Sequence, residues 1–337
     1  MKVISEERTV NYPPPTSDAA PRLGIDLGGT NMQAALVDER SAILARTWRP
    51  TRAHEGSEAV LGRIEEAVRE VCGKAGCDLN GIPAVGIVSP GGIDHASGVV
   101  LDAPNLGWTD LPLRELLQSR LGRPVVVEND VNGAVWGEYM ATRQENAAAR
   151  DLLGVWVGTG VGGGLILNGA LHHGPLSTAG EIGQTVFAPH EPTGLRTVED
   201  HASRTGYSRF IRQQLDSFPD SVLRAAVDAE TGVVPAPELQ RAWMGGDQLA
   251  RRTIDGMTAA LGVAIANTVT LLALDRVVIG GGVTEALGEP FLDAIRAVFG
   301  ENVFPARGRS CSLSMTKLEA DAGLIGAALL ARTEGGP

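Results

Sequence analysis

The sequence predicts an α/β protein built from two related halves with a cleft between them. A strand that ends in a glycine-rich turn and returns as a second strand occurs twice, over residues 23–37 and 152–167. Each of these openings is followed by alternating helix and strand patterns, which is typical of a sheet covered by helices. The same order of elements in both halves indicates an internal structural duplication.

The first half begins at Arg22, where an apolar strand meets the turn Gly28-Gly29-Thr30. Two more short strands follow over 32–37 and 43–48, which suggests an antiparallel meander. Apolar residues then recur with helical spacing over 57–74. The remaining predicted elements are a strand over 84–88, a helix over 111–121, a strand over 125–128 and a helix from Asn129.

The second half starts with a strand over 152–157, a glycine turn over 158–164 and a partner strand over 165–167. The later predicted elements are helices near 199–215 and 247–274, a strand over 276–279, a third glycine turn over 280–282, a strand near 311–317 and a helix over 320–331. We therefore expect an N-terminal domain over 22–134 and a C-terminal domain over 135–319. The last helix, 320–334, is expected to pack back on the first domain, and residues 1–21 are expected to form a flexible Pro-rich arm.

Composition narrows the classes of function. The formal net charge is −11 and the sequence pI is about 5.1, which argues against nucleic acid or an anionic membrane surface as a partner. The N-terminal segment has no apolar core, so it is not a signal peptide, and no run approaches the ~20 apolar residues of a membrane span. Three cysteines are too few for a disulfide framework. A cytoplasmic enzyme fits best.

The first glycine turn follows an acidic residue, Asp26. Backbone N–H groups of such a turn can bind phosphate. A carboxylate beside them would repel the phosphate unless a cation lies between, and Mg²⁺, held mainly through water, is the natural cation. The second glycine turn carries Thr159, so both turns could hold one polyphosphate.

A candidate general base follows the apolar strand over 125–127. Phosphoryl transfer to an alcohol needs a carboxylate near the hydroxyl, and Asp130 stands at a strand end, where open α/β sheets place their ligands. Asn129 beside it can bond to sugar hydroxyls. Both residues are also favoured helix N-caps, and capping alone would explain them.

Together these motifs resemble the ROK family of sugar kinases and related repressors, over residues of about 23–331. That resemblance implies the actin-like/hexokinase (ribonuclease H-like) ATPase fold, with two duplicated α/β domains around a cleft. The matching segments are Asp26-Leu27-Gly28-Gly29-Thr30, Pro90-Gly91-Gly92-Ile93-Asp94, Ala103-Pro104-Asn105-Leu106, Glu128-Asn129-Asp130-Val131-Asn132, the glycine run 158–164, Ala179-Gly180-Glu181-Ile182-Gly183 and the adenosine motif 277–283.

The resemblance implies a role for each matching residue. Asp130 would be the general base, and Asp26 would lie near Mg²⁺. The sugar would be bound by Gly91, Asn105, Asn129, Asp130, Glu181, Gln184 and Glu199. The last of these is aligned by the run Glu199-Asp200-His201-Ala202-Ser203, which resembles the end of the family signature. ATP would be bound by Asp26, Gly28, Gly29, Thr30, Gly158, Thr159, Gly160, Gly162, Gly281, Gly282 and Val283. Expected partners are a hexose and ATP, without nucleic acid or membrane, and the family commonly forms homodimers.

The sequence departs from the family pattern in one segment. Gln184 stands where many members have a sugar-contacting His, and residues 189–198 contain none of the cysteines that bind structural zinc in those members. We therefore expect no zinc, because two nearby histidines, His190 and His201, without thiolates make a poor structural site. Because Gln184 replaces a residue that contacts the sugar in those members, the identity of the sugar substrate stays open.

Several alternatives remain at this stage. Glucose is the default substrate, and fructose, mannose, N-acetylglucosamine and N-acetylmannosamine are alternatives. A sugar-sensing repressor would need a DNA-binding domain that a 21-residue arm does not supply. A non-catalytic sugar-binding protein and the use of polyphosphate alongside ATP are the other options.

Overall fold

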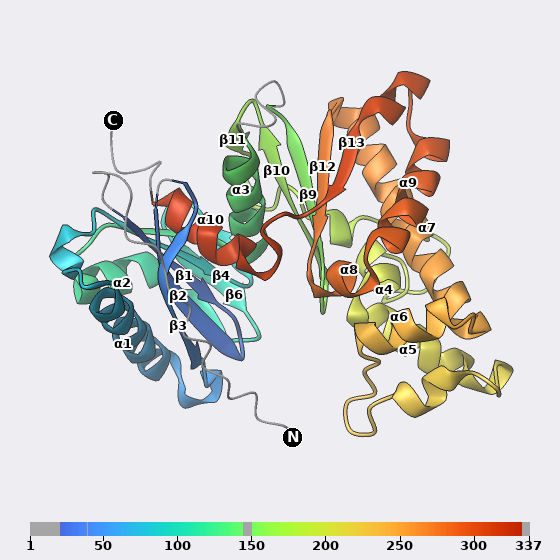
Figure 1. Ribbon diagram of the computed structural model, residues 1–337, viewed down its shortest axis with the longest axis horizontal. Coiled ribbons are helices and arrows are strands. Elements are labelled where there is room, and N and C mark those ends of the chain that lie inside the picture. Colours follow the sequence, from blue (N-terminus) through green and yellow to red (C-terminus); the bar gives the residue numbers. More distant parts are fainter. Residues whose placement is uncertain (1–20, 39, 144–149, 332–337) are drawn as a thin grey trace. The chain divides into compact units, whose positions relative to one another are not determined.

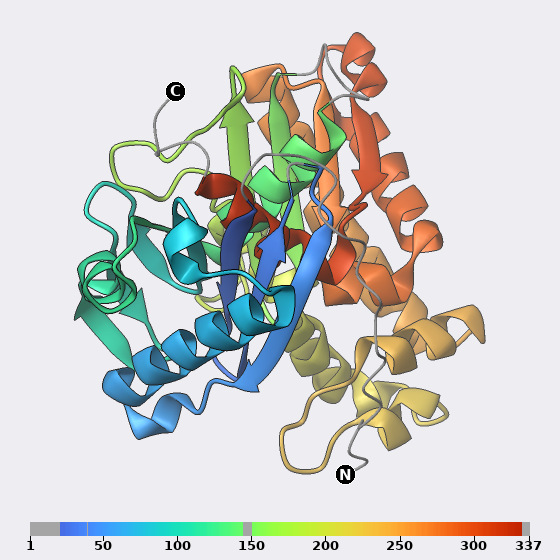
Figure 2. The ribbon, with the colours of Figure 1, turned by 60° about the vertical axis from the view of Figure 1, so that its left-hand side comes forward.

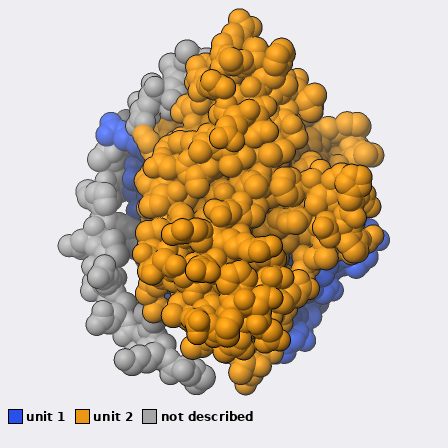
Figure 3. All heavy atoms as spheres, turned by 90° about the vertical axis from the view of Figure 1, so that its right-hand side faces the viewer, with its two compact units in different colours: residues 1–133, 324–337 blue, residues 134–323 orange. Residues whose placement is uncertain are grey.

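The computed structural model describes residues 21–38, 40–143 and 150–331, so nearly all of the predicted arm lies outside the described residues. The chain divides into two compact units. The first comprises residues 1–133 and 324–337, and the second residues 134–323 (Figure 3). Both boundaries fall inside helices, the first within α3 (Asp130–Thr142) and the second within α10 (Ala322–Leu330).

The first unit contains a five-stranded sheet of order β3-β2-β1-β4-β8. Strand β1 pairs antiparallel with β2, and β2 with β3, which confirms the predicted meander. β4 and β8 continue the sheet in the direction of β1. The bounds are β1 Arg22–Leu27, β2 Asn31–Val37, β3 Ile43–Pro50, β4 Val85–Ser89 and β8 Val125–Asn129.

Helices cover this sheet on both faces. On one face lie α1 (Ser57–Ala75) and α2 (Leu113–Leu121) (Figures 1 and 2). Their apolar residues form one cluster with every second residue of the strands, as the twofold period of a strand requires. On the other face lies α10. Gly24 and Gly86 point toward it, and a Cβ on either would collide with its backbone. Glycine therefore allows α10 to lie directly on β1 and β4.

A small second sheet in the first unit was not predicted. It consists of β5 (Gly92–Asp94), β6 (Val99–Ala103) and β7 (Trp108–Leu111), paired antiparallel in that order. The expected helix over 111–121 was wrong at its start, because Leu111 closes β7 and Pro112 precedes the first helical residue, Leu113.

The second unit repeats the strand plan of the first. Its sheet has the order β11-β10-β9-β12-β13, with β10 antiparallel to both β9 and β11 and with β12 and β13 parallel to β9. Three antiparallel strands followed by two parallel ones match the first sheet, which confirms the predicted duplication. The bounds are β9 Leu152–Val157, β10 Val161–Leu167, β11 Ala170–Leu171, β12 Arg276–Gly280 and β13 Ser312–Met315.

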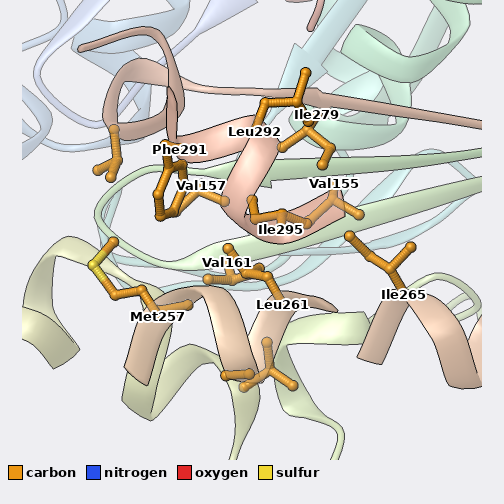
Figure 4. Packing of buried hydrophobic residues seen from close by; sticks show 14 of the residues in the cluster. Val155, Val157, Val161, Met257, Leu261, Ile265, Ile279, Phe291, Leu292 and Ile295 are labelled. Atoms are coloured by element: carbon orange, nitrogen blue, oxygen red, sulfur yellow. The ribbon is translucent and has the colours of Figure 1, made fainter. Parts of the chain in front are cut away.

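The long helix α7 (Gln248–Leu272) forms the centre of the second unit. It packs with α9 (Glu289–Asn302). Figure 4 shows side chains of both helices and of strand residues such as Val155 and Ile279 in one cluster of buried apolar residues. By length and composition alone α7 could cross a membrane, so the expectation that no segment approaches such a span was wrong. Its apolar residues instead build the core, including Met257, Leu261 and Ile265, each at most 1% exposed.

Some predicted helices of this unit differ in extent. The single helix expected over 199–215 is two, α4 (Val198–Ala202) and α5 (Arg204–Gln214), because Ser203 between them is extended and caps α5. α6 (Ala236–Met244), α8 (Gly282–Leu287) and α9 were not predicted. Short 3-10 turns complete the described chain at Ala53–Glu55, Leu79–Gly81, Ile182–Gln184, Leu215–Ser217, Val222–Ala226, Ala306–Ser310 and Glu319–Asp321.

Candidate active site

In the first unit, the candidate residues gather at one edge of the sheet. β1, β4 and β8 are parallel neighbours, so their carboxyl ends meet at the same edge. Asp26 lies near the end of β1, and Asn129 and Asp130 lie where β8 passes into α3. This is the edge at which open α/β sheets bind ligands.

The carboxylates of Asp26 and Asp130 lie close enough to repel each other. Burial, together with this repulsion, raises the pKa of Asp26 from an ordinary value of 3.8 to about 6. A cation between the two carboxylates would relieve that repulsion. The electrostatics of the edge therefore suit a divalent metal ion.

Asn129 uses both ends of its amide inside the protein. Its Oδ1 accepts from the backbone N–H groups of Val131 (2.9 Å) and Asn132 (3.1 Å). Its Nδ2 donates to the carbonyl of Gly91 (3.1 Å). Asn129 is thus a helix cap and an anchor for the loop at Gly91, and the capping interpretation holds for it whatever else it binds.

Gly91 is required by the geometry of this loop. Its φ is +100°, a conformation that L-residues rarely adopt. A Cβ there would also lie 2.9 Å from the Cα of Ala103. The loop therefore crosses directly over β6, and Asn129 holds it there.

The first glycine turn is fixed by a residue that the sequence did not mark. Thr51, which is fully buried, donates its hydroxyl to the carbonyl of Gly28 (2.6 Å) and its N–H to that of Thr30 (2.8 Å). A Cβ on Gly29 would lie 2.9 Å from that of Asn105, so the turn packs against the predicted sugar residue Asn105. Thr30 itself is exposed.

A buried acid behind this edge was also missed as a site residue. Glu128 is 1% exposed, and its Oε1 accepts from the N–H of Asn129 (2.9 Å) and the amide of Asn132 (3.1 Å). Its Oε2 lies 3.1 Å from Nδ1 of His95, which follows β5. Glu128 thus links β8, α3 and the β5–β6 loop beneath the candidate base.

The second unit holds the other glycine turn, between β9 and β10. Gly158 closes it by donating to the carbonyl of Gly160 (2.8 Å), and Gly162 lies in β10 opposite Trp156. The first residue of α5 is hydrogen-bonded to this turn, because Arg204 donates its N–H to the carbonyl of Gly158 (2.9 Å). The guanidinium of Arg204 also donates to the hydroxyl of Thr159.

Three predicted sugar residues gather beside the same turn. Glu199 accepts from the N–H of Val161 (2.8 Å) with one oxygen and from the amide of Gln184 (3.3 Å) with the other. Loss of solvent around its carboxyl, together with repulsion from Glu199, raises the pKa of Glu181. Glu181, Gln184 and Glu199 therefore form one polar cluster beside Val161, the first residue of β10.

The third glycine turn follows β12. Gly281 has a φ of +91°, and a Cβ on it would lie 2.8 Å from the backbone nitrogen of Val157. Gly282 has open space where a Cβ would stand. Val283 is 2% exposed and belongs to the core, so of this predicted motif only its backbone could face a nucleotide.

The segment that replaces the expected zinc loop is held by hydrogen bonds. Phe187 and Ala188 both donate to the carbonyl of Arg196. His201 bonds to the carbonyl of Leu195 (2.9 Å) and lies edge-on to the ring of Phe187. His190 is exposed.

Comparison with known proteins agrees with this architecture. The model of the ROK family matches residues 22–334. The chain belongs to the ROK family. Among curated relatives, a glucokinase from Thermotoga maritima is 34% identical over 91% of this chain and 95% of its own length. An N-acetylmannosamine kinase from Salmonella heidelberg is 32% identical over 92% of this chain and 98% of its own length.

Solved structures of this ROK chain's relatives share its fold. A ROK family glucokinase from Streptomyces griseus, in complex with glucose and AMPPNP, has a TM-score of 0.76 at 31% identity. The match covers 93% of this chain and 99% of that one. The predicted actin-like/hexokinase fold class is thereby confirmed.

Proposed function

We propose that this ROK protein is an ATP-dependent hexose kinase that converts glucose to glucose 6-phosphate. The observation that carries the proposal is the pair Asp26 and Asp130 at the carboxyl edge of β1 and β8. The carboxylate of Asp130 can accept a proton, and that of Asp26 can hold a metal ion beside the phosphates. The curated glucokinases among its relatives support the same activity.

In this reaction Asp130 acts as the general base. As its carboxylate takes the proton of the sugar hydroxyl, the hydroxyl oxygen forms a bond to the terminal phosphorus of ATP. The bond from that phosphorus to the bridging oxygen breaks, and ADP leaves with the electron pair. Asn129 contributes by holding the loop at Gly91, so that the acceptor side is preorganised.

The two glycine turns form the donor side of the proposal. Gly28, Gly29 and Thr30 in the first unit, with Gly158, Thr159, Gly160 and Gly162 in the second, supply backbone N–H and hydroxyl donors for phosphate. The backbone at Gly281, Gly282 and Val283 would lie against adenosine. Mg²⁺ would be held at Asp26, largely through water, where it supplies positive charge for the phosphates.

On the sugar side, carboxylates and amides suit hydroxyl groups, which donate and accept hydrogen bonds. Glu181, Gln184 and Glu199 in the second unit, with Gly91, Asn105 and Asn129 in the first, are proposed for this role. The N-acetylmannosamine kinase among the relatives favours an N-acetylhexosamine as the second candidate substrate. We further propose that the enzyme is a cytoplasmic homodimer.

A coupled assay of ADP release tests the proposal. The full-length protein is supplied with Mg·ATP and, in turn, glucose, mannose, fructose, N-acetylglucosamine and N-acetylmannosamine. We expect the highest kcat/KM with glucose. Preference for N-acetylmannosamine would replace glucose as the substrate, and sugar binding by thermal shift without turnover would indicate a sensor instead of an enzyme.

A further inference from the structure

Arg204, the first residue of α5, is placed on the second glycine turn by several bonds. Its N–H donates to the carbonyl of Gly158 (2.9 Å), and its guanidinium Nη2 donates to the Thr159 hydroxyl. The next residue, Thr205, holds the same turn through its N–H (3.3 Å) and its hydroxyl (2.9 Å), both donated to the Thr159 carbonyl. The position of the guanidinium is therefore fixed relative to the turn.

The charge of Arg204 is not used in an ion pair within the described part of the chain. Other arginines of this acidic protein contact carboxylates, as Arg49 does with Glu66 and Glu70. Among the described residues, the guanidinium of Arg204 donates instead to the neutral hydroxyl of Thr159. A half-buried guanidinium with five donors, of which Nη2 serves Thr159, retains donors for an anion.

We infer that Arg204 is a phosphate-binding residue of this protein and that its guanidinium contacts the terminal phosphate of ATP together with Thr159. The inference rests on the proposed kinase function, in which the glycine turn around Thr159 faces phosphate. Arginine suits this role because its planar fork can hold two phosphate oxygens at once and stays charged at any physiological pH. It also neutralises the charge carried by the phosphoryl group during transfer.

Binding measurements test this role without requiring turnover. The full-length protein and its Arg204→Gln variant are titrated by calorimetry with AMPPNP and with AMP. We expect Arg204→Gln to weaken the affinity for AMPPNP about 10- to 100-fold, as loss of a charge-assisted hydrogen bond does. The affinity for AMP should stay within about threefold of wild type. Arg212→Gln, two turns further along α5, removes the same charge and should leave both affinities unchanged.

A double variant separates direct contact from support of Thr159. If the guanidinium contacts phosphate, Arg204→Gln still weakens AMPPNP about tenfold in a Thr159→Ala background. If Arg204→Gln caused no further loss of AMPPNP affinity in the Thr159→Ala background, Arg204 would only position Thr159, and the inference would be overturned. Equal loss of AMP and AMPPNP would overturn it too.

Inorganic tripolyphosphate is the second probe, because contact with phosphate does not depend on adenosine. Wild-type protein should bind it more tightly than Arg204→Gln, and equal binding or none would overturn the inference. Failure of the proposed function has a different signature, since wild-type protein would then bind AMPPNP with the Arg204 dependence intact and turn over no sugar.

Discussion

At Asp130 one carboxylate serves both the backbone and the proposed reaction. Its Oδ1 accepts from the N–H of Val131 at 2.9 Å, as Asn129 does at the same helix start. Asparagine at position 130 would keep an oxygen for that bond and would match the shape of the acid. Asp130→Asn should therefore remove proton acceptance while leaving α3 in place.

For Asp130→Asn we expect kcat to fall by roughly 10²- to 10⁴-fold, the usual contribution of a general base, with sugar affinity within about tenfold of wild type. Steady-state kinetics gives kcat, and calorimetric titration with the sugar gives the affinity. Near-normal turnover in this variant would remove Asp130 from the role of base.

Asp26 predicts a pH-dependent stability. Its pKa is about 6 in the folded protein and 3.8 ordinarily, so the folded state binds the proton more tightly than the unfolded chain. The penalty for ionising it is absent below pH 4 and complete above pH 6. In metal-free buffer Asp26→Asn should therefore raise the free energy of unfolding by roughly 1 to 3 kcal/mol at pH 8 and by little at pH 4. Urea unfolding at both pH values measures this, and an equal effect at both would contradict it.

The sequence marked the site residues that stand at strand ends or in glycine turns, because a local pattern exposes them. Asp26 lies near the end of the apolar strand β1 and Asp130 directly follows β8, and the structure places their carboxylates close enough to repel each other. The sequence could not mark Thr51, Arg204 or the pair Glu128–His95 as site residues. Their roles depend on bonds between residues far apart along the chain, such as Thr51 to Gly28.

At the scale of elements, the prediction succeeded where periodicity was long and failed where elements were short. The helix predicted over 57–74 is α1, Ser57–Ala75, because its apolar residues repeat over five turns. β5 to β7 have three to five residues each and carry too few alternations to be recognised. The break at Ser203 depends on a single cap, which a helical pattern on both sides conceals.

The packing of α10 on the first sheet predicts a strong effect at one glycine. A Cβ on Gly86 would collide with the carbonyl of Ala327, which belongs to the helix backbone and cannot swing away. Gly86→Ala should lower the free energy of unfolding by about 1 to 3 kcal/mol, as overpacking does. Gly62→Ala is the matched control, since nothing lies within 4 Å of that position in α1, and it should stabilise by about 0.5 to 1 kcal/mol. Denaturant unfolding compares the two; a Gly86→Ala protein as stable as wild type would contradict this packing.

For the molecule as a whole, the internal duplication was predicted from the sequence, and the two sheets confirm it. That the protein needs no zinc stays a prediction. Residues 185–200 hold themselves together, with Asp200 accepting from the N–H groups of Arg196 (2.9 Å) and Thr197 (3.0 Å). We expect the same melting temperature with and without EDTA, because these bonds need no metal. Stoichiometric zinc in the purified protein, measured by atomic absorption, would refute this expectation.

The discontinuity of the first unit bears on how the protein is made. Residues 134–323, about 190 in number, are synthesised after the first sheet and before α10, whose residues 324–330 cover that sheet. At 5–20 residues per second, the face of β1 and β4 that carries Gly24 and Gly86 stays without its covering helix on the ribosome for roughly 10 to 40 s. The second unit, which is continuous in sequence, can complete its core in that interval. The half that emerges first is therefore the half that is completed last, because its own final helix is synthesised only after the whole of the second unit.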